Sequence, residues 1–417
     1  MYIVHSQSFR HGGAFRSILL THRWHKTAFV LLRLSGCACF AVLQSCANQT
    51  EEASGADWDT PRIAQTASAR VGSVQSVRQV ASLRTARAAH TATTLPSGEA
   101  LVVGGMGEGG SSLASVELFD PHRNTVKELG SLVEPRSAHT ATLLGDGRVL
   151  IAGGYNGSYL ASVEVFDPST KRFRSGGSLA EGRSGHTASL LADGRILFVG
   201  GLGPGWTFLR SAELYNPKTG RSESVEPMSV PRESHTSTLL ADGRVLVVGG
   251  HSGRRPNVQV YKSAELFSPA SRRFESAGTL AIARHKHDAI RMTDGRVLII
   301  AGADRTDRVH YATTEIYDPR TAAFAPAPSM ANSRYKIAGT SVLLENGNVL
   351  VTSGAAVAEL LEVSEWKFRA IDGRFPAAYR FAAVAPLSNG DVLIAGGYSD
   401  GNRNTAGVWR FANLSPQ

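Results

Sequence analysis

The stretch His139-Thr-Ala-Thr-Leu-Leu-Gly-Asp-Gly-Arg-Val-Leu-Ile-Ala-Gly153-Gly154 decides the fold. A short run with β-branched residues comes first, and Asp146-Gly147 follows it. Asp-Gly is a frequent hairpin turn, because glycine adopts the positive φ that such turns need. The apolar run after the turn fits a strand that is buried on both faces. The stretch therefore predicts two antiparallel strands joined by a tight turn, and the two glycines allow neighbouring backbone to approach closely.

The same unit returns along the chain in seven copies, whose starts are 49, 47, 49, 52, 52 and 43 residues apart. Close copies run from His186 to Gly200-Gly201 and from His235 to Gly249-Gly250. Looser copies run from His90 to Gly104-Gly105, from His287 to Gly302-Ala303 with the second glycine lost, from Gly339 to Ser353-Gly354, and from Ala382 to Gly396-Gly397. This regularity predicts an array of similar supersecondary units.

Each unit continues into a third and a fourth strand. Ser115–Pro121 reads Ser-Val-Glu-Leu-Phe-Asp-Pro, with counterparts that begin at Ser162, Ser211, Ser263 and Thr313. The proline ends the strand because it removes a hydrogen-bond donor. An apolar residue often returns six residues after the aspartate or its equivalent, as at Val126 and Phe173, and marks a short fourth strand. Each unit therefore contains four antiparallel strands.

Four strands in each unit of about 50 residues resemble the kelch repeat, and the resemblance covers residues 73–411. The double glycine after an apolar strand is the hallmark of that family, and five of seven copies have it. The family's Tyr-then-Trp pair survives only as Phe or Tyr and Phe. The resemblance implies an all-β fold, a seven-bladed β-propeller of four-stranded kelch-type blades over residues 73–417.

The last copy ends after its third strand, near Val408–Phe411. Before the first copy, residues 77–83 align with the fourth strand at residues 173–179. We therefore expect residues 75–80 to complete the seventh blade and close the ring.

The N-terminal segment has a different composition from the rest. Residues 1–45 contain five basic and no acidic residues, and all three cysteines lie within the first 46 residues. Leu43-Gln44-Ser45-Cys46 resembles a bacterial lipobox, which implies a lipoprotein signal peptide over 1–45, lipidation of Cys46, and a flexible tether over 46–72. Ala47 after the cysteine implies an exported outer-membrane lipoprotein, periplasmic or surface-facing. Plain cleaved export, an uncleaved signal anchor and a misassigned start are the alternatives.

The formal charge of +9 falls to +4 when the five basic residues of the N-terminal segment are set aside. No run of lysine or arginine remains, so nucleic acid is not an expected partner. Because no cysteine follows Cys46, the main body has no disulfide, cysteine nucleophile or thiolate metal site. We expect no cofactor and no metal.

Five copies share an Arg-x-x-His motif, which could form a metal ring or a repeated structural bond. We favour a structural role, because a residue repeated in nearly every blade usually makes the same internal bond in each blade. The histidines would bond backbone or a neighbouring blade, and the arginines would pair with the glutamate of the third strand. The pairs are Arg87/His90, Arg136/His139, Arg183/His186, Arg232/His235 and Arg284/His287, and the glutamates are Glu117, Glu164, Glu213, Glu265 and Glu315.

The loops after the second strand vary, and the resemblance implies that they share one face with the loops before the first strand. Arginine, tyrosine and tryptophan dominate interface energies. Solvated loops with a few anchoring aromatics are the alternative to a binding face. The excess of arginine favours an acidic protein or glycan. The candidate contacts are Tyr155, Tyr159, Trp206, Phe208, Arg254, Arg255, Tyr261, Arg305, Arg308, Tyr311, Tyr398 and Arg403.

These patterns predict a monomeric, non-catalytic binding module of the cell envelope that recognises a protein or polysaccharide through the loop face. The alternatives are a carbohydrate-acting enzyme, such as a periplasmic sugar mutarotase or isomerase, and a purely structural role. Copper radical oxidases of similar fold need a cysteine cross-linked to tyrosine, which this body lacks. A carboxylate, an arginine and a histidine that converge at one mouth of the channel would favour an enzyme.

Overall fold

The computed structural model describes residues 75–413. The predicted signal peptide (1–45), the lipidation site Cys46 and the tether (46–72) lie outside the described residues. Within residues 75–413 no helix combines the length and the apolar character needed to cross a membrane.

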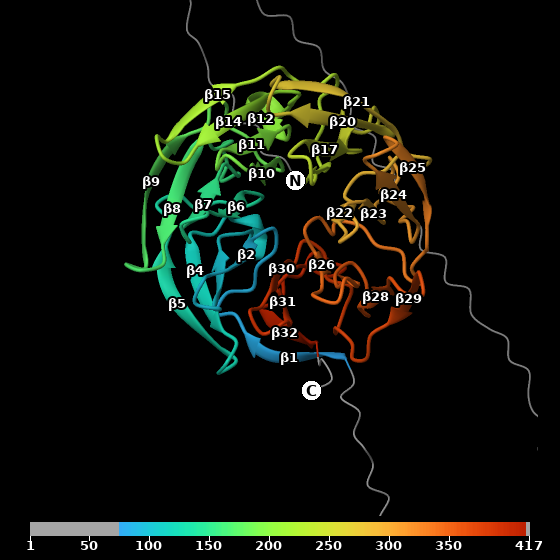
Figure 1. Cartoon of the computed structure of the whole chain (residues 1–417). Coiled ribbons are helices and arrows are strands. Elements are labelled where there is room, and N and C mark those ends of the chain that lie inside the picture. Colours follow the sequence, from blue (N-terminus) through green and yellow to red (C-terminus); the bar gives the residue numbers. More distant parts are fainter. Residues whose placement is uncertain (1–74, 414–417) are drawn as a thin grey trace, which may run out of the picture. The chain divides into compact units, whose positions relative to one another are not determined.

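Seven four-stranded antiparallel sheets follow one another around a ring, which confirms the predicted seven-bladed propeller (Figure 1). Blade 1 contains β2 (Thr91–Thr94), β3 (Ala100–Val103), β4 (Ser115–Asp120) and β5 (Thr125–Ser131). Blade 2 contains β6 (Thr140–Leu143), β7 (Val149–Ala152), β8 (Ser162–Asp167) and β9 (Arg172–Ser178). Blade 3 contains β10 (Thr187–Leu190), β11 (Ile196–Val199), β14 (Ala212–Asn216) and β15 (Arg221–Ser224). Blade 4 contains β16 (Thr236–Leu239), β17 (Val245–Val248), β20 (Ser263–Ser268) and β21 (Arg273–Thr279).

Blade 5 contains β22 (Asp288–Arg291), β23 (Val297–Ile300), β24 (Thr314–Asp318) and β25 (Ala323–Ala327). Blade 6 contains β26 (Ser341–Leu343), β27 (Val349–Val351), β28 (Glu359–Glu362) and β29 (Lys367–Ala370). Blade 7 contains β30 (Ala383–Pro386), β31 (Val392–Ala395), β32 (Gly407–Ala412) and β1 (Ser76–Ser82). The loops hold two single-turn 3₁₀ helices, η1 (Glu108–Gly110) and η2 (Pro204–Trp206), and two short ribbons, β12 (Leu202–Gly203) with β13 (Thr207–Phe208) and β18 (His251–Ser252) with β19 (Gln259–Val260).

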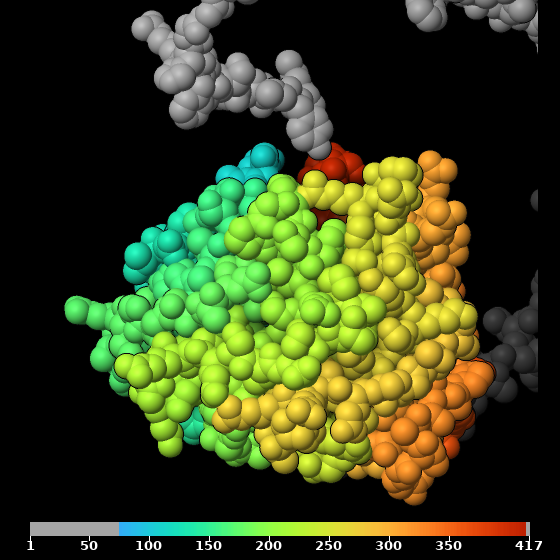
Figure 2. All heavy atoms as spheres, turned by 90° about the horizontal axis from the view of Figure 1, so that it is seen from above, coloured from blue at the N-terminus to red at the C-terminus, as the bar shows by residue number. Residues whose placement is uncertain are grey.

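The strands of a blade differ in burial in the way the sequence indicates. The second strand, such as β7, is buried at every position, which explains its continuous apolar run. The first strands of successive blades contact one another around the axis. Figure 2, turned by 90°, shows the side of the ring, where segments coloured green to orange follow one another. The apolar clusters lie between blades, as where Leu101 and Leu118 of blade 1 pack with Val149 and Phe166 of blade 2.

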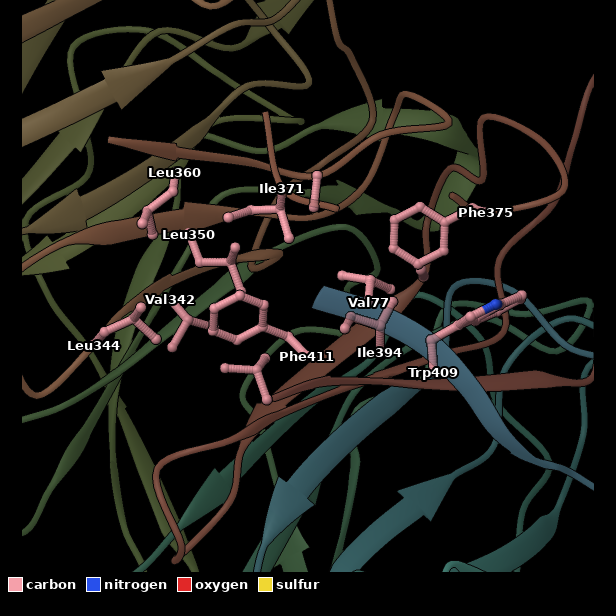
Figure 3. Packing of buried hydrophobic residues seen from close by; sticks show 13 residues of the cluster. Val77, Val342, Leu344, Leu350, Leu360, Ile371, Phe375, Ile394, Trp409 and Phe411 are labelled. Atoms are coloured by element: carbon pink, nitrogen blue, oxygen red, sulfur yellow. The ribbon is translucent and has the colours of Figure 1, made fainter. Parts of the chain in front are cut away.

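In blade 7 the first and the last described strands lie side by side (Figure 1). β1 pairs antiparallel with β32, with Val77 opposite Phe411 and Gln79 opposite Trp409. Val77, Trp409 and Phe411 belong to one buried cluster (Figure 3). The segment expected to close the ring, residues 75–80, overlaps this strand.

The first glycine of each repeated pair accommodates a histidine from the next blade. A Cβ added at Gly200 would lie 2.8 Å from Cε1 of His235 and 2.5 Å from the carbonyl oxygen of Arg232. In blade 5 the structure places Ala301 at this position and Gly302 at the second, so the prediction that copy five lost its second glycine was wrong. The copy lost its first glycine instead. Blade 6 has Ile337 where blades 1 to 5 have histidine, so Ala301 faces an aliphatic side chain of its own buried cluster.

The arginine of each Arg-x-x-His motif pairs with the predicted glutamate of its own blade, and the five expected ion pairs are confirmed. Arg136, for example, is fully buried, lies 2.8 Å from Glu164 and donates to the carbonyl of Gly153. Blade 6 contains a sixth pair, Arg334 with Glu359 at 2.7 Å. Because this arginine lacks the histidine that follows in other blades, the sequence motif missed it.

Candidate functional site

A cavity of about 770 Å³ lies at one end of the propeller axis, and residues from all seven blades line it. Loops before the first strands and loops after the second strands both contribute, as in Ala89 and Met106 of blade 1. The expectation that these two sets of loops share one face therefore agrees with the structure. We call this space the axial cavity.

A ring of seven residues forms the wall of the axial cavity. Each stands two residues after the repeat arginine or its equivalent, and each has a φ between 49° and 59°. The backbone N–H of six of them donates to the carbonyl of the corresponding residue in the preceding blade, at 2.8–3.0 Å. We call them the axial belt, which comprises Ala89, Ala138, Gly185, Ser234, Lys286, Lys336 and Phe381.

The backbone of the belt is regular, but its side chains are not. Blades 1 to 3 contribute alanine, alanine and glycine, whereas blades 4 to 7 contribute serine, two lysines and phenylalanine. One half of the cavity is therefore open, and the other half carries the polar and aromatic groups. The sequence analysis missed these residues. The sequence does mark them in one way: each stands directly before the histidine position of the Arg-x-x-His motif, and its identity varies from repeat to repeat.

A chain of titratable side chains leads from the axial cavity into blades 4 and 5. Nε2 of His285 lies 3.1 Å from Asp307 and 3.0 Å from the carbonyl oxygen of Asp304, so it carries the proton. Its Nδ1 lies 3.1 Å from Nδ1 of His251. The same His251 nitrogen lies 3.4 Å from the carboxylate of Glu233, which lines the cavity. The chain connects a cavity carboxylate to a second carboxylate through two imidazoles.

The environment separates the pKa values of these groups. Burial raises the pKa of Glu233, against the opposing bond from Ser234. Burial also acts upward on Asp307, but the bonds from His285 and Lys286 outweigh it and hold its pKa well below the usual range. Burial, followed by the charges of His285 and Lys286, lowers the pKa of His251 to about 3. At neutral pH Asp307 is therefore an anion that neutralises Lys286, whose Nζ lies 2.7 Å away.

On the wall formed by blades 6 and 7, Lys336 stands among aromatic rings. Its Nζ donates to the hydroxyl of Tyr398. The same atom lies 5.2 Å, 5.7 Å and 5.1 Å from the ring centroids of Tyr335, Phe381 and Tyr398. Burial raises the pKa of Tyr398, so its hydroxyl stays neutral. Unlike Lys286, Lys336 forms no ion pair with any carboxylate of residues 75–413.

Four of the predicted loop residues come together from three blades. The ring centroids of Tyr155 and Tyr159 are 5.1 Å apart, and Trp206 lies 6.1 Å and 5.9 Å from them. The guanidinium of Arg254 lies over Trp206 at 4.6 Å. Trp206 is 52% exposed, which is unusual for so large an apolar side chain. We call Tyr155, Tyr159, Trp206 and Arg254 the aromatic patch.

A smaller pocket of about 270 Å³ adjoins this patch and is rich in arginine. Two residues of the patch, Trp206 and Arg254, line this pocket. Three other loop residues predicted from the sequence line it as well, namely Phe208, Arg255 and Arg305. Phe208 packs against His251 at 5.4 Å, and Arg255 lies 3.3 Å from Asp307. We call it the basic pocket.

The remaining predicted loop residues lie elsewhere. Arg308 and Arg403 are exposed. Tyr261 is buried, its ring under the guanidinium of Arg232 at 5.4 Å, and Tyr311 lies likewise 5.6 Å from Arg284. Tyr398 is buried in the axial cavity. The structure therefore does not present Tyr261 or Tyr398 as exposed loop contacts, because both pack against the frame of their blades.

The repeated histidines connect neighbouring blades. Nε2 of His139 lies 3.0 Å from the hydroxyl of Thr91 in blade 1, and the same bond joins Thr140 to His186, Thr187 to His235 and Thr236 to His287. These bonds between blades support a structural role for the repeated histidines. His90 differs, because blade 7 has Ala383 at the threonine position. Both nitrogens of His90 are buried without a hydrogen-bond partner among the described residues.

The fold and the loop face define a β-propeller with a ligand-sized axial cavity. Residues 136–180 match the kelch motif, and this match together with the seven four-stranded blades supports a kelch-repeat β-propeller. No curated protein matches it by sequence. Among solved structures it is similar to a fungal alcohol oxidase of the AA5 family in complex with copper, with 14% identity, a TM-score of 0.63, and coverage of 81% of this chain and 75% of that one.

At that identity the likeness concerns the fold alone. We tested whether the residues could hold the copper of that relative. Among residues 75–413 no group of three or more histidine, cysteine, aspartate or glutamate side chains is arranged to hold a metal ion. The described part also contains no cysteine. The described residues therefore do not fit the copper centre of that oxidase.

Proposed function

We propose that this protein is a binding module of the cell envelope that recognises an acidic partner, a protein or a polysaccharide, through the loop face of the propeller. The observation that carries the proposal is the aromatic patch. An exposed tryptophan packed on half-buried tyrosines beside an arginine combines the residue types that contribute most to binding energy at interfaces. The exposed indole of Trp206 also suits contact with the apolar face of a sugar ring.

The basic pocket supports an acidic partner. Arg254, Arg255 and Arg305 contribute three guanidinium groups, and Asp307 offsets only part of this charge. Guanidinium groups bind carboxylates and sulfates with paired hydrogen bonds. A partner that stacks on the aromatic patch would thus place its acidic groups in the basic pocket.

The envelope location rests on the sequence of the N-terminal segment. We propose that Cys46 carries a lipid anchor in the outer membrane and that the propeller acts as a monomer. A propeller anchored through a flexible tether suits the capture of a partner at the membrane surface.

The test is capture of partners from native envelopes by the full-length protein. We expect the unaltered protein to retain a partner that the double variant Trp206→Ala/Arg254→Ala loses. The matched control is Val133→Ala/Arg174→Ala, which removes an exposed apolar side chain and an exposed arginine outside the patch. Protease treatment of the captured material separates a protein from a polysaccharide. Equal recovery by the unaltered protein and the patch variant would contradict the proposal.

A carbohydrate-acting isomerase is the second candidate function, and one observation favours it. Glu233 lines the axial cavity, has a raised pKa and continues into the His251–His285 chain. A carboxyl group with a raised pKa can both donate and accept a proton, which anomer exchange requires. The expected combination for an enzyme was a carboxylate, an arginine and a histidine at one mouth of the channel. The cavity brings Glu233 and histidines together with Lys286 and Lys336, but no arginine of residues 75–413 lines it.

A further inference from the structure

The axial cavity is formed before any ligand binds. Its wall is the backbone of the axial belt, in which hydrogen bonds of 2.8–3.0 Å run from blade to blade. Small residues on blades 1 to 3 leave the space open: a Cβ at Gly185 would lie 2.9 Å from Oε1 of Glu233. A volume of about 770 Å³ lies within the range of small-molecule sites.

The charge of the cavity is unevenly compensated. Three charged side chains line it, Glu233, Lys286 and Lys336. Both carboxylate oxygens of Asp307 neutralise Lys286, at 2.7 Å and 2.9 Å. Lys336 donates one of its three N–H groups to Tyr398 and has no carboxylate partner within residues 75–413. A half-buried ammonium without a counter-ion favours the binding of an anion.

A second group without a partner stands nearby in the ring. His90 is 6% exposed, lines the cavity, and bonds to nothing through either nitrogen in the described residues. Blade 7 lies between His90 and Lys336, and there Ala382 and Ala383 replace the histidine and threonine of other blades. This replacement removes the threonine partner of His90, whose two nitrogens stay buried between blades 7 and 1.

We propose that the axial cavity binds a small organic carboxylate whose anionic group pairs with Lys336. The rings of Phe381 and Tyr398 enclose the carbon skeleton of the ligand. One uncompensated cation, with Glu233 on another wall, selects a monoanion over a dianion. The inference goes beyond the proposed function, because it uses neither the aromatic patch nor a macromolecular partner.

The test is calorimetric titration of the full-length protein with lactate, glucuronate and benzoate, with glucuronamide as the uncharged counterpart of glucuronate. We expect at least one carboxylate to bind saturably, and its uncharged counterpart (lactamide, glucuronamide or benzamide) at least tenfold more weakly. Lys336→Gln should weaken carboxylate binding at least tenfold, and Lys336→Arg should retain most of it. A thermal melt establishes that both variants are folded.

Three results would overturn the inference: no carboxylate binds, acid and amide bind equally, or Lys336→Gln binds like the unaltered protein. The double variant Trp206→Ala/Arg254→Ala should titrate normally, because it leaves the axial cavity intact. If the unaltered protein captures no partner but binds a carboxylate, only the proposed function fails. If it captures a partner but binds no carboxylate, only this inference fails.

Discussion

At the scale of single residues, the double glycine of each blade is coupled to a histidine of the next. Five blades have a first glycine, and in each case the following blade has the histidine whose ring lies against it, as for Gly200 and His235. The two exceptions, Ala301 and Ser353, face Ile337 and Ala382. The first glycine is therefore kept because a ring and a carbonyl occupy the volume of its missing Cβ.

We predict that Gly200→Ala lowers the free energy of unfolding by at least about 2 kcal/mol. The new Cβ would meet the Arg232 carbonyl at 2.5 Å, and the positive φ costs a further ~1 kcal/mol. The matched control is Ala301→Gly, the same position in blade 5. It should change stability by less than about 1 kcal/mol, because relief of the positive φ of 60° offsets the loss of a buried methyl group. Urea unfolding measures both, and equal losses would contradict the argument.

At the scale of elements, blade 7 is held together differently from the others. In blade 7, Tyr379 and Trp409 stand where the other blades have the buried arginine and glutamate, and their rings lie 5.1 Å apart. Trp409 pairs with Ile394 as Glu164 pairs with Ile151. Well-packed apolar residues can replace a buried ion pair without loss of stability. The resulting cluster of thirteen buried residues includes Val77, so the N-terminal strand packs against apolar side chains.

We predict that Val77→Asp lowers the free energy of unfolding by at least about 3 kcal/mol, because it buries an unpaired charge in the apolar cluster between β1 of blade 7 and the strands of blade 6. Val77 is 4% exposed, whereas Gln79 on the same strand is exposed. Gln79→Asp introduces the same charge and should change stability by less than ~0.5 kcal/mol. If the two variants melt alike, β1 does not contribute to closure of the ring.

At the scale of the whole molecule, neutral histidines join the blades into a ring. Burial, with the charge of the preceding arginine, lowers the pKa of His139 and His235 to about 3. The pKa values of His90, His186 and His287 also lie well below 6.5, with burial again the largest cause. The native ring therefore binds no proton at these sites at pH values where the unfolded chain does.

This difference sets the pH dependence of stability. Unfolded histidine titrates near 6.5, so stability is complete above about pH 7 and falls as the pH drops from about 6.5 toward 3. Each of the five histidines contributes up to about 1.4 kcal/mol per pH unit. We predict a large loss of unfolding free energy between pH 7 and pH 5, measured by urea unfolding. His235→Gln should reduce this loss, and His122→Gln, at an exposed position, should leave it unchanged. A flat profile would refute the prediction.

The strands and the ion pairs could be predicted because they repeat. Seven copies of one pattern reveal the turns, the buried strand and the arginine–glutamate pair, and errors in one copy are corrected by the others. The prediction of which glycine copy five had lost was wrong, because the first glycine position is defined by a histidine ring from the next blade, and blade 6 has Ile337 there. The loop residues were a weaker prediction. Trp206 and Arg254 lie in contact, as a binding face requires. Tyr261 is also an aromatic loop residue, but it is buried, and its residue type does not reveal this.

The sequence by itself determined the all-β class, the number of blades and the identity of the repeated frame, because each follows from local period and from turn chemistry. Only the tertiary structure decided which variable residues share a site. Lys286, Lys336 and Phe381 are 50 and 45 residues apart along the chain, and they meet because closure of the ring brings equivalent positions of neighbouring blades to one axis. That convergence depends on contacts between blades, which no local pattern contains.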